Sequence, residues 1–217
     1  MKTGLMCIGI GGIGLMKHWN IGILLFNEVE LLDFAGPYEV FSITSYFDSQ
    51  QKPFSVHTVA QTTDLISARN GLKVQPDYNF NNSPHFDILI VPGGYGAEVI
   101  EIKNTVLIKW IKDKAQECDM IASVCTGAFL LAEAGLLDGK QATTHWMDID
   151  RLQSDYKTIK VQRGIKFVDE TSIITSGGIS AGINMSFFIL NRLVGEEIAI
   201  ATAKRMEYDI DIHHMIK

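Results

Sequence analysis

The feature that most constrains this fold is a short apolar strand that ends at a cysteine and turns at once into a helix. Residues 120–124 are apolar or small, Cys125 follows, and residues 127–132 combine a small-residue turn with good helix formers. This pattern predicts a nucleophile elbow, which holds a side chain at the carboxyl end of a sheet. Backbone N–H groups and the positive end of a helix dipole would favour a thiolate there. A small buried cysteine within the core is the alternative that this stretch alone leaves open.

Composition and charge exclude several classes of protein. The 217 residues carry a net charge of −6 with scattered basic residues, so we expect no nucleic-acid partner. Cys7, Cys118 and Cys125 are widely spaced and form no C-x-x-C motif. This argues against a disulfide framework and a zinc site, and it favours a reducing, cytoplasmic location. We expect no metal, because His213 and His214 sit in the C-terminal tail and no cluster has ligand spacing. We expect no membrane partner, because the apolar N-terminal stretch is too short and glycine-rich for a span.

The chain is predicted to comprise an N-terminal extension (1–18), one domain (19–208) and a C-terminal tail (209–217). Residues 9–14 match the dinucleotide fingerprint G-x-G-x-x-G. That fingerprint must open a helix, and the six residues before the next strand leave no room for one. We therefore reject a dinucleotide site and expect no cofactor.

Strands and helices alternate along the domain. Buried strands are predicted at 21–26, 54–60, 86–91 and 120–124, with hairpins at 63–80 and 160–174 and a short strand at 141–146. Helices are predicted at 34–43, 105–117, 127–132, 147–152, 183–194 and 196–208. The alternation indicates a single doubly wound, mostly parallel α/β sheet with helices on both faces. The loops after residues 26, 91 and 124 should meet at the carboxyl edge of that sheet, where such folds bind ligands.

These loops supply a nucleophile and a pocket for developing negative charge. Cys125 would be the nucleophile, and the amides of Gly93 or Gly94 and of Thr126 would bind the charge, since glycine lets a ligand approach the backbone. Two plainer readings stay open. The Gly93–Gly94 pair fits a simple tight turn, and Thr126 fits an ordinary first-turn helix residue.

An acid and a histidine complete the candidate set. Asp33 or Glu30 could lie against the sulfur and, if protonated, donate to the thiolate and later to the substrate. Asp33 also fits the N-cap of a helix beginning at Phe34. No histidine adjoins Cys125, so any cysteine–histidine couple requires His145 or another loop, and His145 also fits a packed, hydrogen-bonded core histidine.

Four motifs in order closely resemble the ThiJ/PfpI superfamily, which has a flavodoxin-like, class I glutamine amidotransferase-like fold. They occupy residues 86–94, 122–128, 142–146 and 175–183. Residues 32–41 and the Cys–Thr–Gly–Ala elbow look most like isonitrile hydratase and its relatives, and also like the sensor domains of AraC-type regulators. The likeness spans about residues 19–208.

The resemblance implies roles for particular residues. Cys125 would be the elbow cysteine, with Asp33 rather than Glu30 as its acidic partner. Thr126 stands where protease-like members carry histidine, so peptidase activity is not expected. His145 matches a family histidine near the cysteine.

The resemblance also bears on the substrate pocket and on partners. Gly178 and Ile179, in the fourth motif, join the expected substrate- or oxyanion-binding residues. Tyr95 departs from the proline of close relatives and would reshape the pocket. Family members are commonly homodimers that act on small molecules without a metal or organic cofactor.

The function expected from these residues is a cysteine-dependent hydro-lyase that converts an isonitrile to an N-substituted formamide. The alternative is a stand-alone ligand- or redox-sensing module without turnover, because an elbow thiolate oxidises readily. No helix-turn-helix array follows the domain before Lys217, so we expect no DNA binding by this chain. Deglycation or hydrolysis of small carbonyl adducts is a third reading, which Thr126 disfavours.

Overall fold

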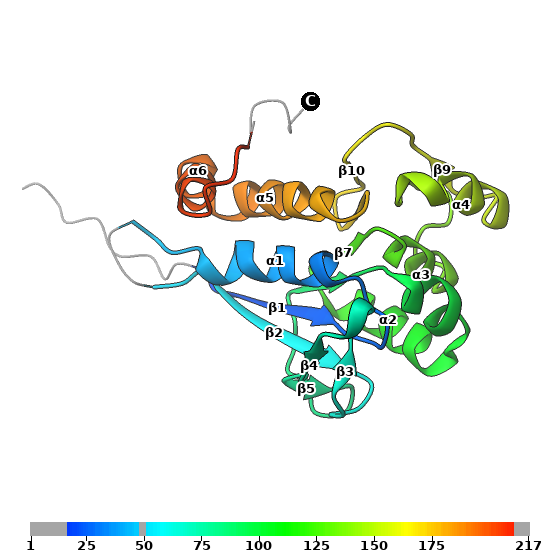
Figure 1. The fold of residues 1–217 in the computed structure, drawn as a ribbon. Coiled ribbons are helices and arrows are strands. Elements are labelled where there is room, and N and C mark those ends of the chain that lie inside the picture. Colours follow the sequence, from blue (N-terminus) through cyan, green and yellow to red (C-terminus); the bar gives the residue numbers. More distant parts are fainter. Residues whose placement is uncertain (1–16, 48–50, 211–217) are drawn as a thin grey trace, which may run out of the picture.

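A computed structural model describes residues 17–47 and 51–210 of the chain. They fold into three layers, with a twisted sheet between two layers of helices (Figure 1). Residues 1–16 and 211–217 lie outside the described parts. The glycine-rich fingerprint and the two tail histidines therefore lie outside them too, and the division into extension, domain and tail stays a prediction. Among the described residues, no helix is long and apolar enough to cross a membrane.

The central sheet has seven strands in the order β10-β11-β7-β6-β1-β2-β5. All neighbours pair in parallel except the β10–β11 hairpin, which is antiparallel. Its strands are β1 (Trp19–Leu24), β2 (Phe54–Ala60), β5 (Tyr78–Asn79), β6 (Ile88–Val91), β7 (Met120–Val124), β10 (Phe167–Asp169) and β11 (Ile173–Ser176). The predicted α/β fold with a mostly parallel sheet is confirmed.

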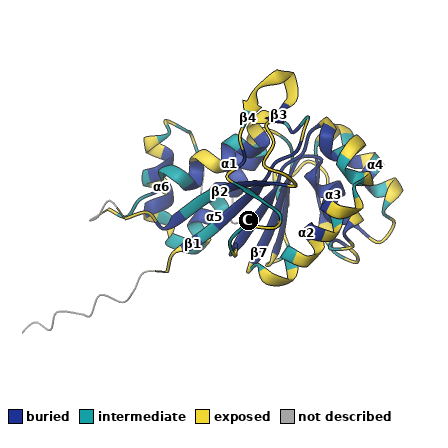
Figure 2. Cartoon of the chain, turned by 90° about the horizontal axis from the view of Figure 1, so that it is seen from below, coloured by how far each residue is buried: buried dark blue, intermediate teal, exposed yellow. Residues whose placement is uncertain are grey.

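Helices cover both faces of this sheet, as Figure 2 shows by the buried strands enclosed between two helical layers. One layer holds α1 (Leu31–Ile43), α5 (Ser180–Val194) and α6 (Glu196–Arg205), which pack against one another. The other holds α2 (Thr105–Glu117) and α3 (Gly127–Glu133), with α4 (Ile149–Asp155) beyond them.

Apolar patterning explains both kinds of element. Strands β6 and β7 are buried along their whole length, as expected for the middle of a parallel sheet covered on both faces. Helix α2 buries Leu107, Trp110 and Ile111, which share one helical face, and its N-cap Asn104 accepts a hydrogen bond from the Leu107 amide at 3.3 Å.

Two local predictions were wrong near helix α1. This helix begins at Leu31 rather than Phe34, so Asp33 lies within its first turn and cannot be its N-cap. The N-cap is Glu30, whose side chain makes no capping hydrogen bond. Pro37 lies inside the helix. Since proline has no N–H, it cannot donate to the carbonyl of Asp33 one turn earlier.

The predicted hairpins formed only in part. The first is confined to β3 (Ile66–Ser67) and β4 (Lys73–Val74), while β5 joins the main sheet. Within the second, only the segments on either side of Glu170 form a hairpin, between β10 and β11. Strand β9 (Lys160–Val161) instead pairs in parallel with β8 (Gln141–Ala142) as a separate two-stranded sheet.

The order in which strands are added to the sheet reverses between β1 and β6. From β1 it proceeds through β2 to β5, and it then returns through β6, β7 and β11 on the other side. The carboxyl ends of β1, β6 and β7 therefore lie at the topological switch point, where open α/β sheets bind ligands.

Candidate active site

Cys125 occupies the sharp turn between β7 and α3. Its φ of 57° lies in the left-handed region, which is rare for a residue with a side chain. Hydrogen bonds hold this backbone: the Cys125 amide donates to the carbonyls of Ser176 (3.1 Å) and Gly177 (3.2 Å), and its carbonyl accepts from the Thr144 hydroxyl at 2.8 Å. Neighbouring segments thus hold the strained backbone of Cys125 in place, as in a nucleophile elbow.

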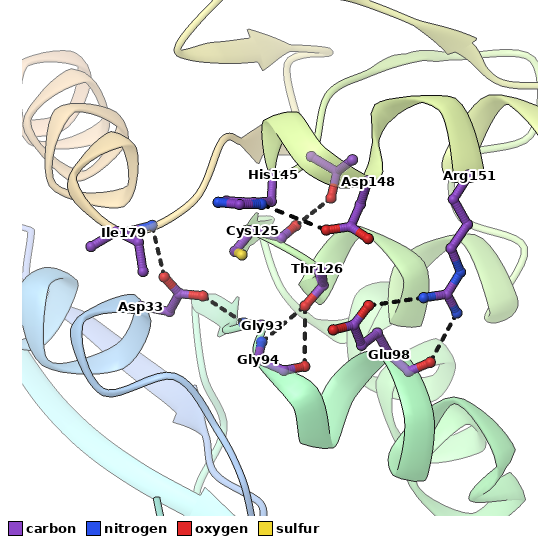
Figure 3. Close-up of polar contacts among 11 residues, drawn as sticks. Asp33, Gly93, Gly94, Glu98, Cys125, Thr126, His145, Asp148, Arg151 and Ile179 are labelled. Carbon is purple, nitrogen blue, oxygen red and sulfur yellow. Dashed lines mark hydrogen bonds and ion pairs between the residues drawn. The ribbon is translucent and has the colours of Figure 1, made fainter. Parts of the chain in front are cut away.

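Asp33 lies against the Cys125 thiol. It is fully buried, and its two carboxyl oxygens accept hydrogen bonds from the amides of Gly93 (3.2 Å) and Ile179 (2.9 Å). Its carboxyl group also interacts with the Cys125 thiol, because each group shifts the pKa of the other, and Figure 3 shows the two side chains as neighbours in the site. The charge of Glu30, the other acid considered, raises the pKa of Asp33, and the Glu30 carbonyl accepts a hydrogen bond from the Asp33 amide at 3.2 Å. Two backbone donors therefore fix the carboxyl group beside the sulfur.

Burial raises the pKa of both groups in this pair. The pKa of Asp33 rises from 3.8 to about 6, because desolvation outweighs the hydrogen bonds from Ile179 and Gly93. The pKa of the Cys125 thiol is also raised, first by burial and then by the negative charge of Asp33, although the amide and hydroxyl of Thr126 lower it. A resting thiolate, expected from the helix dipole alone, is therefore disfavoured. The pair retains a proton near neutral pH.

Thr126 and the two glycines of the β6 loop lock together. The Thr126 hydroxyl accepts from the Gly94 amide at 2.9 Å and donates to the Gly94 carbonyl at 3.2 Å. A side chain on Gly93 would lie 2.5 Å from the Thr126 nitrogen, so only glycine fits there. The amides of Gly93 and Gly94 thus bond to Asp33 and Thr126, and their expected role in binding negative charge on a substrate stays a prediction.

Gly178 and Ile179 close the site from the loop before α5. A Cβ atom on Gly178 would lie 2.4 Å from His145 Cδ2 and 3.0 Å from Cys125 Sγ, so glycine brings these two side chains close to one another. Ile179 has a φ of 55°, a strained conformation for a β-branched residue, and this conformation directs its amide to Asp33.

His145 lies beside the sulfur but pairs with an acid of its own. Its Nδ1 is 3.6 Å from Asp148 Oδ2, and both side chains are about four-fifths buried, at 22% and 20% exposure. No hydrogen bond joins His145 to Cys125 among residues 17–47 and 51–210. The sequence patterns did not point to Asp148, Glu98 or Arg151. Only the three-residue spacing from His145 to Asp148 could have indicated one of them.

A cleft of about 420 Å³ is lined by residues that adjoin Cys125, although Cys125 is not itself one of the lining residues. Its lining includes His145 and Gly178, which lie close to the Cys125 sulfur, together with Ile179 and the apolar side chains of Trp146 and Ile165. Cys125 itself is 6% exposed. In the described part of the chain, no three His, Cys, Asp or Glu side chains are grouped so that they could hold a metal ion.

The sequence model of the DJ-1/PfpI family matches residues 20–192, which include every site residue described above. The chain belongs to the DJ-1/PfpI family. Solved structures agree with this fold. A ThiJ/PfpI family protein from Pseudomonas syringae superposes with a TM-score of 0.80 at 24% identity, covering 96% of this chain and 85% of that one. Drosophila melanogaster DJ-1beta superposes with a TM-score of 0.76 at 17% identity, covering 89% and 100%.

Two kinds of curated relative are similar in sequence. An isonitrile hydratase from Pseudomonas putida is 35% identical over 189 residues, covering 87% of this chain and 78% of that protein. The transcriptional regulator GbdR from Pseudomonas aeruginosa is 26% identical over 190 residues, covering 88% of this chain but only 51% of the regulator. The curated relatives therefore include a named enzyme as well as a regulator that is about twice as long as the matched region.

Proposed function

We propose that this protein is an isonitrile hydratase-like enzyme that adds water to a small isonitrile and releases an N-substituted formamide. The observation that carries the proposal is the pairing of Cys125 with Asp33, a fully buried carboxyl group whose pKa is raised to about 6. Such a group exchanges a proton readily near neutral pH. The similarity to the Pseudomonas putida isonitrile hydratase supports this choice of substrate.

The first half of the reaction would form a covalent adduct. The Cys125 sulfur attacks the terminal carbon of the isonitrile while the Asp33 carboxylate takes the thiol proton. Asp33 then delivers this proton to the same carbon. Sulfur and hydrogen are now both bonded to that carbon, and the product is a thioformimidate, R–N=CH–S–Cys125. Thiolate character develops only as the carbon–sulfur bond forms, in keeping with the raised pKa of the resting thiol.

The second half would release the product. Water adds to the thioformimidate carbon and the nitrogen gains a proton. The carbon–sulfur bond then breaks, its electron pair leaves with sulfur, and sulfur regains a proton as the carbonyl forms. The products are R–NH–CHO and the free thiol, so one water is consumed and no redox cofactor is required.

The test is formamide production from cyclohexyl isocyanide by the purified protein. We expect N-cyclohexylformamide from the wild type and from Cys118→Ser, which makes the same change at a half-buried cysteine outside the site. Cys125→Ser should yield none above the buffer blank. Equal product from the wild type and Cys125→Ser would refute the proposal.

A ligand- or redox-sensing role is the second candidate, and the similarity to GbdR favours it. Burial and the raised pKa of Cys125 argue against the redox version, because the thiolate is the form that peroxide oxidises. Exposure to mild peroxide followed by peptide mass spectrometry separates the two. Sulfenic acid at Cys125, together with no formamide in the assay above, would favour the sensor.

A further inference from the structure

His145 lies next to Cys125, but the mechanism proposed above gives roles only to Cys125 and Asp33. Its imidazole packs at Gly178, where the missing side chain leaves room for the ring and the sulfur, and it lines the cleft of about 420 Å³. Figure 3 shows the ring extending from Asp148 towards the side of the Cys125 sulfur and Ile179. With Nδ1 facing Asp148, Nε2 is the ring nitrogen left for the cleft.

Asp148 belongs to the same short turn as His145, and its carboxylate has a second acid as a neighbour. Its backbone amide donates to the carbonyl of His145 at 2.9 Å, which closes a short helical turn (Trp146–Asp148). Its carboxylate lies near Glu98, whose pKa is raised first by burial and then by the charge of Asp148. Arg151 clamps Glu98 through Nη1 to the carboxylate at 2.8 Å and Nη2 to the backbone carbonyl at 2.9 Å.

The Arg151 guanidinium also lies 4.6 Å from the ring centroid of Phe129, a fully buried residue of the elbow helix α3. Together these contacts join the helix that follows the nucleophile to α4, which directly follows the turn that carries His145 and Asp148. A carboxylate facing one imidazole nitrogen stabilises the N–H on that nitrogen and leaves the other as a proton acceptor. Contacts of this kind are often long in a free enzyme and tighten when the substrate is bound, which accommodates the 3.6 Å separation.

We propose that Asp148 is a positioning residue that holds His145 as the base for the water that releases product from Cys125. His145 Nε2 takes a proton from water in the cleft as the water oxygen bonds to the carbon attached to sulfur. The proton returns to the reaction as the carbon–sulfur bond breaks. Asp33 serves the formation of the adduct, and His145 with Asp148 serves its breakdown. This inference rests on the covalent step of the proposed function.

The experiment uses p-nitrophenyl acetate, which acylates a nucleophilic thiol whatever the natural substrate is. Sulfur attacks the ester carbonyl, p-nitrophenolate leaves with the bonding pair, and water then converts the thioester to acetate and free thiol. The nitrophenolate burst measures acylation, and the loss of the acetyl mass from the intact protein measures deacylation. The variants are Asp148→Asn, His145→Gln and the control Asp155→Asn, which makes the same acid-to-amide change at a carboxylate that lies 3.5 Å from Arg151 Nε.

In Asp148→Asn and His145→Gln we expect acylation within about twofold of the wild type and deacylation slowed by about 10²-fold, the range for loss of a general base. Acetyl-Cys125 should then accumulate, and hydroxylamine should restore its release, because this nucleophile needs no base. Asp155→Asn should match the wild type. A merely structural role for Asp148 would slow both steps together and would not respond to hydroxylamine.

Equal slowing of both steps, an unchanged deacylation rate or the absence of acetyl-Cys125 in the wild type would each overturn the proposal. The cyclohexyl isocyanide assay reports separately on the proposed function. If that assay fails while deacylation depends on Asp148, the substrate is wrong and the assignment of His145 and Asp148 stands. If formamide forms while deacylation ignores Asp148, the proposed function stands and the assignment is wrong.

Discussion

At the scale of single residues, the chemistry depends on one buried carboxyl group and one buried thiol that share a proton. Neither group alone is suited to this chemistry, because Asp33 is hidden from water and the Cys125 thiol resists ionisation. Placed side by side, each changes the proton affinity of the other. The backbone amides of Gly93 and Ile179 fix the carboxyl group, so the pair is oriented before a substrate arrives.

The raised pKa of Asp33 predicts how activity depends on pH. The carboxylate must be ionised to accept the thiol proton, so kcat/KM with cyclohexyl isocyanide should rise with pH through a midpoint near 6. Glu30→Gln removes a negative charge that raises this pKa, and we expect it to keep the activity but shift the midpoint to lower pH. Asp33→Asn should lower kcat/KM by at least about 10²-fold and abolish the rise of kcat/KM with pH. A midpoint unmoved in Glu30→Gln and still present in Asp33→Asn would contradict the assignment.

The same shift predicts a pH-dependent stability. Because the folded pKa of Asp33 lies above its unfolded value of 3.8, its contribution is fully present below pH 3.8 and is lost as pH rises through about 6. The whole change is at most about 3 kcal/mol, from roughly two pKa units at 1.36 kcal/mol each. Urea denaturation from pH 4 to 8 should show the free energy of unfolding of the wild type falling relative to that of Asp33→Asn. If the two proteins showed the same change in the free energy of unfolding with pH, Asp33 would have the same pKa in the folded and unfolded states.

At the scale of elements, the elbow and the loops at the switch point depend on close backbone packing. The sequence predicted this arrangement because β7, Cys125 and α3 are adjacent in the chain and their patterning is local. The expected convergence of the strand-end loops also predicted an acid from the first loop beside Cys125, but the contact between Ile179 and Asp33 left no such signal. Ile179 donates to Asp33 across 146 positions, and nothing around Ile179 indicates its strained backbone. The predicted start of α1 was too late in the chain. Proline is common in the first turn of a helix, but Pro37 lies inside this one.

Two adjacent glycines provide a matched test of this packing. Gly178→Ala would drive a methyl group into His145 and the Cys125 sulfur, whereas Gly177→Ala meets its nearest neighbour, the Ala181 Cβ, at an ordinary 3.4 Å. We expect Gly178→Ala to lower kcat/KM by about 10-fold or more with little change in the far-ultraviolet circular dichroism, and Gly177→Ala to remain within about threefold. Equal effects of the two substitutions would mean that the space at Gly178 is not part of the site.

At the scale of the whole molecule, a helical layer (α1, α5 and α6) and the sheet bring together residues from most of the chain. Asp33 comes from α1 and Ile179 precedes α5, two helices that pack against each other. A shift of α5 relative to α1 would therefore disturb the carboxyl group directly. Several apolar side chains are exposed near the cleft and on α1: Leu31, Leu32, Tyr38, Trp146 and Met147.

The resemblance to the family predicts a homodimer, and such exposed apolar residues suit an interface. Size-exclusion chromatography with light scattering should report twice the chain mass of 24.1 kDa at micromolar concentration. A fully active species with the mass of a single chain would contradict this expectation.

The proposed mechanism as a whole rests on a covalent bond between Cys125 and the substrate carbon, formed with the help of Asp33. Rapid quenching of the reaction with cyclohexyl isocyanide, followed by intact-protein and peptide mass spectrometry, tests it most directly. We expect a mass increase equal to one isocyanide on the peptide containing Cys125, forming at least about 10²-fold more slowly in Asp33→Asn. Formamide produced with no adduct at Cys125, or an adduct that forms equally fast without Asp33, would contradict it.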